Sequence, residues 1–538
     1  MRPHPLAVAL GLSLAIAGTL QGQNNGATRP TVILTGGKVF TADSMRPWVE
    51  AIAVRGDRIL AVGTTSAIER LAGPHTRRIA LGGRVVIPGI NDAHDHLGGA
   101  DLGTTFPIDP SPTPDPAPAA LLDSIRAIAS RSPSGAWLAF QVGMRVLGDS
   151  TIDRTTLDGV APNHRVVLRG WWGHGMVLNS AALAGLGIRE DARDPLGGFF
   201  MRTADGRLTG RLDEYARWSA EQRLGAFTPD AVVIASLRAY ADSALRVGVT
   251  SVQDMAGYMP PGRTVRLFRA ARLPLRVRLV RWSTPTERSM NLAEWDSIGQ
   301  QVAPRVVVDG RKWVLDGTPI ERLALRRTPY EERPGWYGRL NFPIDSVRAM
   351  LDAALRPGAP QLHLHIVGDS SAELVLGAME SLAPDSVWRA RRVRIEHGPS
   401  ITGSRIERVA RLGIVIAQPR EGGAYRSWRA AGIPVAYGSD GLRNPFLHML
   451  WATTGGRGGD ETIAREEYMR VLTSGSAYAE RREKDKGTLS PGKLADLSVL
   501  SQDIFTVTPQ ALPDTRSVLT MIGGGVVYDA LGQAARVR

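Results

Sequence analysis

The chain has 538 residues, of which 43% are hydrophobic and 22% charged, as expected for a folded globular protein with a large core. The absence of cysteine excludes disulfides, thiolate metal sites and cysteine nucleophiles, so any metal must be held by nitrogen and oxygen ligands. The net charge is +13, but the arginines are dispersed without a basic tract or an aromatic-interleaved patch, and we expect no nucleic-acid partner.

The N-terminus has the pattern of a secretory signal peptide. Arg2 precedes an apolar run of about fifteen residues, which is short for a membrane span. We therefore expect residues 1–22 to be a signal peptide, cleaved between about Ala17 and Gln23, although a retained anchor is an alternative. The mature protein would be exported to a periplasm or secreted, without stable membrane insertion.

Both ends of the mature chain predict short strands separated by Gly and Pro turns. Gly36-Gly37 and Gly56-Asp57 punctuate apolar runs in residues 23–86, and the same pattern returns in residues 481–538. We expect these two segments to build one small β-sandwich domain.

Residues 87–480 predict an α/β domain, specifically a (β/α)8 TIM barrel. A helical pattern over Ala231–Arg246 is followed by apolar segments that alternate with plausible helices up to Asp440, which indicates βα units and a parallel sheet. Each candidate strand ends in polar residues, as at the catalytic end of such barrels. A Pro-rich loop at 109–118 and mixed apolar runs predict an insertion at about 130–225.

The first candidate barrel strand ends in the segment P-G-I-N-D-A-H-D-H, which carries His94 and His96. Residues two apart on a strand point to the same face, so both imidazoles can share one metal ion. Two histidines on a solvated strand are the structural alternative. Further nitrogen and oxygen donors at later strand ends favour a metal site, with candidates His365, His397 and Asp440.

Lys312 is the sixth candidate ligand. It is the only lysine between Lys38 and Lys484 in a chain that otherwise uses arginine as its cation. A deprotonated primary amine can add CO2 to form a carbamate that bridges two cations, whereas a guanidinium cannot. An ion pair with Asp309 or Asp316 is the structural alternative.

Spacing alone leaves the choice between His363 and His365 open, because both lie on the same strand face. Asp440 closes the last candidate strand and could both bind metal and carry a proton. Two cations would share a hydroxide, lower the pKa of its parent water and polarise the scissile carbonyl. A nearby carboxylate would then move the proton to the leaving nitrogen.

Taken in order, these motifs resemble the amidohydrolase superfamily, in particular amidohydrolase family 3 with its N-substituted formamide deformylase-like proteins. The resemblance covers nearly the whole mature chain. The motifs that carry it are P-G-I-N-D-A-H-D-H, G-H-G-M-V-L-N-S, G-V-T-S-V-Q-D, K-W-V-L-D-G, H-I-V-G-D, R-I-E-H-G, G-S-D-G-L-R-N-P-F and G-T-L-S-P-G-K-L-A-D-L.

The resemblance implies a division of ligands between metals. His94, His96 and Asp440 would hold one metal, His365 and His397 a second, and Lys312 would bridge them as a carboxylated lysine. Within H-I-V-G-D the resemblance selects His365 over His363, and it puts His174 near the substrate, where it would polarise the carbonyl. We expect a divalent metal, zinc, as one or two ions per chain.

The resemblance thus implies a hydrolase of a non-peptide amide or related C–N bond, acting on a small molecule. A dipeptidase-like member of the same superfamily and a catalytically silent barrel acting as a binding protein are the alternatives. The oligomeric state stays open, with a homodimer as one option. The R-E-G-G segment after Pro419, where relatives often have a histidine, and the Pro-rich loop both depart from the pattern, so specificity does not transfer.

Overall fold

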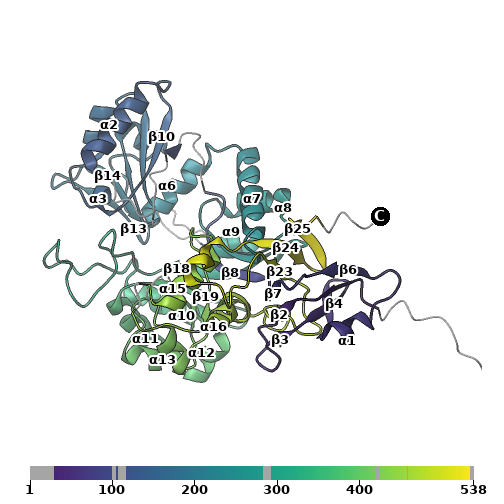
Figure 1. Cartoon of the computed structure of the whole chain (residues 1–538). Coiled ribbons are helices and arrows are strands. Elements are labelled where there is room, and N and C mark those ends of the chain that lie inside the picture. Colours follow the sequence, from purple (N-terminus) through teal and green to yellow (C-terminus); the bar gives the residue numbers. More distant parts are fainter. Residues whose placement is uncertain are drawn as a thin grey trace, which may run out of the picture.

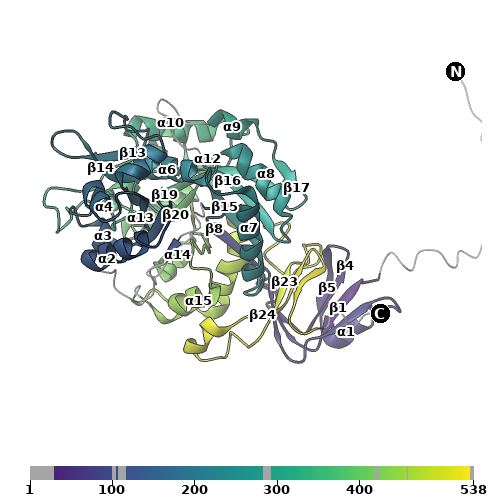
Figure 2. The ribbon, with the colours of Figure 1, turned by 90° about the horizontal axis from the view of Figure 1, so that it is seen from above.

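The computed structural model describes residues 29–99, 105–106, 117–171, 173–282, 292–417, 423–456 and 459–532. The expected signal peptide, residues 109–116 of the Pro-rich loop and residues 418–422 lie outside them. Within the described ranges, no helix is both long and apolar enough to cross a membrane. Figures 1 and 2 show a barrel, an inserted sheet on one side and a pair of sheets on the other.

Eight parallel strands form a nearly closed barrel, which confirms the predicted (β/α)8 fold. In barrel order they are β8 (Ile90–Asp95), β15 (Val249–Ala256), β16 (Arg276–Trp282), β18 (Val306–Val314), β19 (Leu362–Ile366), β20 (Arg394–His397), β21 (Val415–Ala417) and β22 (Val435–Ala436). A short strand, β17 (Gln301–Ala303), pairs antiparallel with β18. Every residue of β8 and β15 is buried, as expected for strands covered on both faces.

The last barrel strand is shorter than the apolar pattern of residues 433–440 suggests. Beyond Ala436 the chain leaves β21 and approaches β8 instead. The amide of Ala93 donates to the carbonyl of Tyr437 (2.7 Å), and the amide of Asp440 donates to the carbonyl of His94 (2.9 Å). These two hydrogen bonds bridge the gap between the first and last strands and fix Asp440 beside His94.

Helices cover the outside of the barrel, as the βα alternation predicts. They are α7 (Asp230–Leu245), α8 (Pro261–Ala271), α9 (Leu292–Ser297), α10 (Ile344–Leu355), α11 (Asp369–Leu382), α12 (Asp385–Arg391), α13 (Ser404–Leu412), α14 (Tyr425–Ala430), α15 (Pro445–Thr454), α16 (Arg465–Arg470) and α17 (Ser476–Ala479). A π-helical turn, Val471–Gly475, separates α16 from α17. At Gly475 a Cβ would lie 2.3 Å from the carbonyl of Val435, so glycine permits this close approach to β22.

The insertion lies between the first two barrel strands and contains a six-stranded sheet. Its strands are β9 (Thr105–Phe106), β10 (Trp137–Val142), β11 (Arg165–Gly170), β12 (Gly175–Leu178), β13 (Gly198–Arg202) and β14 (Leu208–Glu214). Its helices are α2 (Pro118–Ala129), α3 (Met144–Leu147), α4 (Arg154–Val160), α5 (Ser180–Gly185) and α6 (Tyr215–Gly225). The insertion therefore begins earlier than the expected boundary near residue 130, because α2 packs in one apolar cluster with β10 and β11.

Two further sheets combine the ends of the described chain into the predicted β-sandwich (Figure 1). One sheet contains β1 (Val32–Thr35), β4 (Ala51–Arg55), β5 (Arg58–Gly63) and β6 (Arg77–Ala80), with α1 (Thr65–Glu69) packed nearby. The other contains β2 (Lys38–Phe40), β3 (Trp48–Val49), β7 (Val85–Pro88), β23 (Leu497–Leu500), β24 (Ser517–Ile522) and β25 (Gly525–Asp529), with a 3-10 turn at Pro509–Asp514. Residues from both chain ends share one buried core that includes Leu34, Ile52, Val499 and Leu519.

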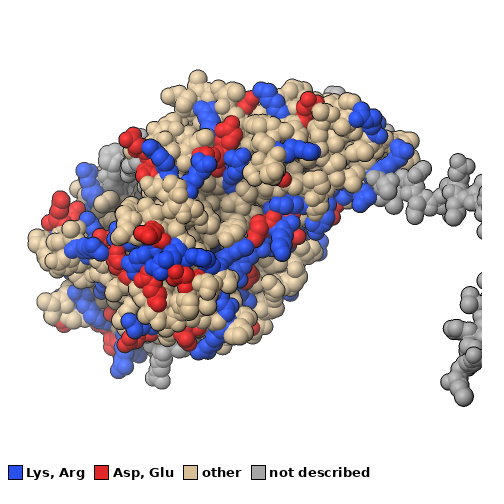
Figure 3. All heavy atoms as spheres, turned by 90° about the horizontal axis from the view of Figure 1, so that it is seen from below, with Lys and Arg blue, Asp and Glu red and all other residues tan. Residues whose placement is uncertain are grey.

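Much of the positive charge has a neighbouring negative charge. On the face shown in Figure 3, Lys and Arg lie side by side with Asp and Glu along a central band. Between α11 and α13, Arg405 contacts Glu373 at 3.0 Å and Arg408 contacts Glu380 at 2.7 Å. Such pairs reduce the local field that the net charge of +13 would otherwise produce.

Candidate metal centre

The six predicted ligands come from five barrel strands or the turns that follow them, and they meet at the carboxyl ends of those strands. They are His94 and His96 (β8 and its end), Lys312 (β18), His365 (β19), His397 (β20) and Asp440 (after β22). His174, predicted to lie near the substrate, enters from the insertion just before β12. Parallel strands of a barrel all end at the same rim, which explains why residues so distant in sequence converge.

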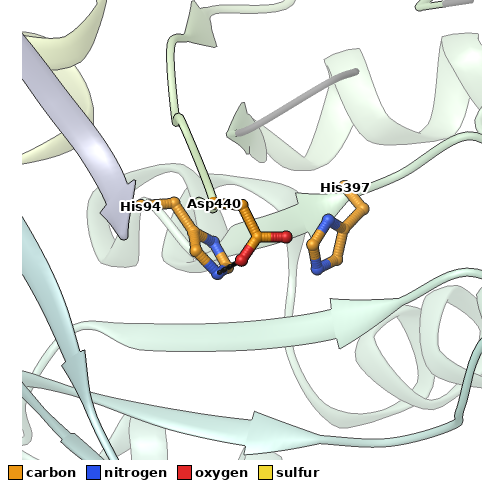
Figure 4. Close-up of side chains that lie close together, drawn as sticks. All are labelled: His94, His397 and Asp440. Carbon is orange, nitrogen blue, oxygen red and sulfur yellow. Dashed lines mark ion pairs between the residues drawn. The ribbon is translucent and has the colours of Figure 1, made fainter. Parts of the chain in front are cut away.

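Three of these side chains form the tightest cluster. The imidazoles of His94 and His397 and the carboxylate of Asp440 offer ligand atoms that all lie within 4.8 Å of one another. Figure 4 shows the Asp440 carboxylate between the two rings. The Asp440 carboxylate also lies 3.4 Å from Nε2 of His96. This spacing suits a divalent cation bound by imidazole and carboxylate.

The other two ligands adjoin this cluster. Nζ of Lys312 lies 3.1 Å from Nε2 of His94, and the ring centroids of His365 and His397 are 4.4 Å apart. The His365 ring is 4.7 Å from the ring of His174. All six predicted ligands and His174 are therefore brought to one place.

The charge state of Lys312 suits a bridging role. Lys312 is buried, and burial lowers the pKa of its amine from 10.5 to about 8, although Glu396 and Asp440 oppose the shift. The ion pairs considered as an alternative do not form. Asp309 pairs with Arg278 at 2.7 Å, and Asp316 accepts backbone hydrogen bonds from the segment after β19.

His365 provides the clearest indication that a metal fits. Its residue is 1% exposed and lines a cavity of about 250 Å³, yet its Nε2 has no hydrogen-bond partner among the described residues. A buried polar atom without a partner is costly, and a metal ion would supply the missing interaction. Burial, with smaller contributions from His397 and His174, also holds the pKa of His365 well below its usual value, so the ring is neutral and able to ligate.

His363, the alternative that spacing left open, is placed differently. It does not line the cavity, and its Nε2 faces Gly310, where an added Cβ would lie 2.8 Å away. Its Nδ1 lies 3.1 Å from a carboxylate oxygen of Glu396. The geometry therefore favours His365 as the ligand.

Glu396 is a buried carboxylate that the sequence analysis missed. It lies 2.6 Å from Nδ1 of His94 and also accepts from Arg394. Burial would raise the pKa of Glu396, but Arg394 and the two histidine hydrogen bonds outweigh it and hold this pKa well below the usual range. An ionised Glu396 fixes the proton of His94 on Nδ1 and leaves the lone pair of Nε2 facing Lys312 and Asp440. The motif R-I-E-H-G, with a carboxylate beside a ligand, was the available signal.

Two aspartates of β8 hold the loop that carries Asp440. Asp92 accepts from the amides of His94 (3.2 Å) and Ser439 (3.0 Å). Asp95 accepts from the amide of Gly441 (3.1 Å), on the other side of Asp440. The first and last barrel strands are thus tied together at the ligands themselves.

A second dyad orients His174. Nδ1 of His174 lies 3.0 Å from Glu214, whose other oxygen accepts from the side chain of Asn341 at 2.8 Å. Burial lowers the pKa of His174, but the attraction and hydrogen bond of Glu214 outweigh it, so the pKa of His174 is raised overall. A raised pKa favours an imidazole that donates a hydrogen bond into the cavity.

Three of these residues have left-handed backbone conformations, which are uncommon outside glycine. The φ angles are 73° for His397, 44° for Asp440 and 55° for Glu214. Each such conformation costs on the order of 1–3 kcal/mol and persists only where the surroundings enforce it. Here it places His397 and Asp440 in the wall of the cavity and Glu214 against His174.

A model of the amidohydrolase family matches residues 77–528. The chain belongs to the amidohydrolase family. Protein LONG AFTER FAR-RED 3 of Arabidopsis thaliana is 26% identical to it over 559 residues, covering 92% of this chain and 91% of that protein. The N-substituted formamide deformylase of Arthrobacter pascens is 26% identical over 553 residues, covering 93% and 99%.

Solved structures share the fold. A metal-dependent hydrolase of Pyrococcus horikoshii superposes with a TM-score of 0.66 at 18% identity, covering 89% of this chain and 99% of the other. Atrazine chlorohydrolase TrzN of Arthrobacter aurescens superposes with a TM-score of 0.51 at 17% identity, covering 93% and 95%. Family membership, together with the His and Asp cluster, supports a hydrolase that depends on a metal.

Proposed function

We propose that this amidohydrolase cleaves a small non-peptide amide or related C–N bond with the help of zinc. The observation that carries the proposal is the convergence of six nitrogen and oxygen donors. Five of them line one cavity and His94 adjoins Lys312 beside it, with Nε2 of His365 buried and unpartnered among the described residues. The similarity to a formamide deformylase supports a C–N bond as the target.

His94, His96 and Asp440 would hold one ion, His365 and His397 a second, and a carboxylated Lys312 would bridge them. Bound metal would supply Lewis acidity and lower the pKa of a water molecule. Asp440 has two carboxylate oxygens at this cluster, so one can accept a proton from that water and pass it to the leaving nitrogen. His174, held by Glu214, would donate a hydrogen bond to the carbonyl oxygen of the substrate.

The size and walls of the cavity suggest the substrate class. A volume of about 250 Å³ is small for a ligand site, and four aromatic side chains are among its lining residues: Trp171, Trp218, Tyr258 and Trp282. This environment favours a short acyl group, such as formyl, on an amine with an apolar or aromatic substituent.

A dipeptidase-like activity is the second candidate, and Arg443 is the observation that favours it. Its guanidinium lines the cavity, is about half exposed and lies over the ring of Tyr240. Among the described residues, only its Nε forms a hydrogen bond, to Asp95 at 2.9 Å. The remaining nitrogens could bind a substrate carboxylate.

Metal analysis of the purified protein, followed by a substrate screen, tests the proposal. We expect one or two zinc ions per chain and hydrolysis of N-formyl or N-acyl amines in preference to cyclic amides and dipeptides. Dipeptide turnover abolished by Arg443→Ala would favour the second candidate. A metal-loaded protein that binds these amides but hydrolyses none would support the silent barrel instead.

We also propose that the protein is exported, because residues 1–22 have the sequence pattern of a signal peptide. N-terminal sequencing of the protein recovered from its native host tests it, with a first residue between about Ala17 and Gln23 as the expected result.

A further inference from the structure

A second cavity, of about 720 Å³, lies where the insertion meets the segment that follows β18. Its walls include Ile152 and Val177 from the insertion and Leu323 and Trp336 from the post-β18 segment. Among the described residues, none lines both this cavity and the catalytic cavity. This cavity, hereafter the insertion cavity, is therefore separate from the candidate metal centre.

The arginines that line the insertion cavity are largely engaged with other groups. Arg211 contacts Asp213 at 3.0 Å and also donates to the carbonyl of Leu147. Arg202 donates to three backbone carbonyls, and Arg322 lies 3.6 Å from Glu332. Arg333 and Arg339 stack over aromatic rings. These cations are therefore poor candidates for binding a further anion.

Glu321 is a buried acid in the wall of this cavity. Burial raises the pKa of its carboxyl group, and the attraction of His174 opposes that rise. Glu321 is 5% exposed, and one oxygen, Oε2, accepts from the hydroxyl of Thr318. The other oxygen, Oε1, has no hydrogen-bond partner in the part of the chain that the structure describes. A buried carboxylate oxygen without a donor or cation is expensive, so this end of the cavity is complementary to a positively charged donor.

Gly175 explains how this carboxylate can lie so close to β12. A Cβ at Gly175 would lie 3.2 Å from Cγ of Glu321 and 3.4 Å from Asp213, so a side chain here would crowd both acids. The neighbouring residue, His174, lines the catalytic cavity. His174, just before β12, thus faces the catalytic cavity, whereas Val177 within β12 lines the insertion cavity.

We propose that the insertion cavity binds an organic cation, a protonated primary amine on an apolar body. The ammonium group would donate to Oε1 of Glu321, and the body would pack against Ile152, Leu323 and Trp336. This inference stands independently of the proposed reaction, although amines are also the class of product that amide hydrolysis releases.

Isothermal titration calorimetry of the full-length protein with benzylamine at pH 7 tests the inference. Benzyl alcohol, which has the same ring without the charge, serves as the matched ligand. We expect benzylamine to bind and the alcohol to bind about tenfold more weakly or worse, because a charge-assisted hydrogen bond is lost.

Four variants locate the binding site. Glu321→Gln should weaken benzylamine binding about tenfold or more, while Glu331→Gln, an exposed residue outside the cavity, should leave it unchanged. Glu321→Asp keeps a carboxylate but moves it away from the ligand by one methylene group, so we expect an intermediate loss of benzylamine affinity. Asp440→Asn, in the catalytic cavity, should retain the binding.

Folding of each variant is checked by thermal unfolding. Glu321→Gln should melt no lower than the wild type, because it replaces a buried acid that lacks a partner at Oε1 by a neutral side chain of the same shape. Equal affinity for the alcohol and the amine would overturn the inference. So would binding that survives both Glu321 substitutions or that is lost in Asp440→Asn. Failure to hydrolyse any amide would overturn only the proposed function.

Discussion

Replacing Lys312 by arginine tests the bridging role most directly. A carbamate forms only on the neutral amine, and burial lowers the pKa of Lys312 to about 8. At pH 7 about one molecule in ten then carries a neutral Lys312, against about one in 3,000 for a lysine at the ordinary pKa of 10.5. The structure thus raises the reactive fraction roughly 300-fold. Lys312→Arg keeps a cation of similar length but stays protonated and cannot form a carbamate.

Carbon-13 NMR of protein equilibrated with labelled bicarbonate and zinc measures the carbamate, and elemental analysis measures the metal. We expect one carbamate signal in the wild type, lost in Lys312→Arg together with at least half of the bound zinc. Lys486→Arg is the matched control. Lys486 is also a buried lysine with a lowered pKa, but its amine contacts Glu480 at 2.6 Å and is not free to react. A signal that persists in Lys312→Arg, or unchanged zinc and rate in that variant, would refute this reasoning.

Three further changes test other parts of the centre. Asp440→Asn should lower kcat by about 10²–10⁴ through loss of the proton carrier while the circular dichroism spectrum stays the same, and full activity would exclude the proton-carrying role. Glu396→Gln should weaken zinc affinity about 10–100-fold, because His94 loses the carboxylate that orients it. Competition with a chelator measures this affinity. The surface variant Glu407→Gln should leave it unchanged. Burial and Arg394 lower the pKa of His363 to about 3, so the unfolded chain binds its proton first as the pH falls. The contribution of neutral His363 to the free energy of unfolding is complete above about pH 6.5 and is lost as the pH falls toward 3. At pH 5 the loss amounts to about 2 kcal/mol. Urea unfolding should show a smaller acid loss in His363→Asn, and an equal loss would contradict this assignment.

The positions of the ligands could be predicted because they depend on a repeating pattern. Each βα unit brings the carboxyl end of its strand to the same rim, so His94, Lys312 and His397 converge whatever the lengths of the connections. Lys312 could be identified because it is the only lysine between Lys38 and Lys484 in a chain rich in arginine. The structure supports these inferences by bringing the side chains together.

The partners of those ligands could not be predicted in the same way. Glu396 contacts His94 across 302 residues, and nothing in local spacing encodes that contact. The left-handed backbone of Asp440 depends on its amide reaching the carbonyl of His94 and on Asp95 holding Gly441. The insertion cavity likewise arises between two segments that are distant in sequence, and composition gives no sign of it.

The insertion also separates metal binding from substrate selection, two tasks that many enzymes assign to the same segments. The donor atoms for metal all belong to the barrel, whereas Gln141, Trp171 and His174 reach the catalytic cavity from the inserted sheet. Exchanging that sheet between relatives could therefore change which molecules are admitted while the hydrolytic machinery stays intact. Mutant libraries that aim to change substrate selectivity are therefore best confined to the residues of the inserted sheet and its connections.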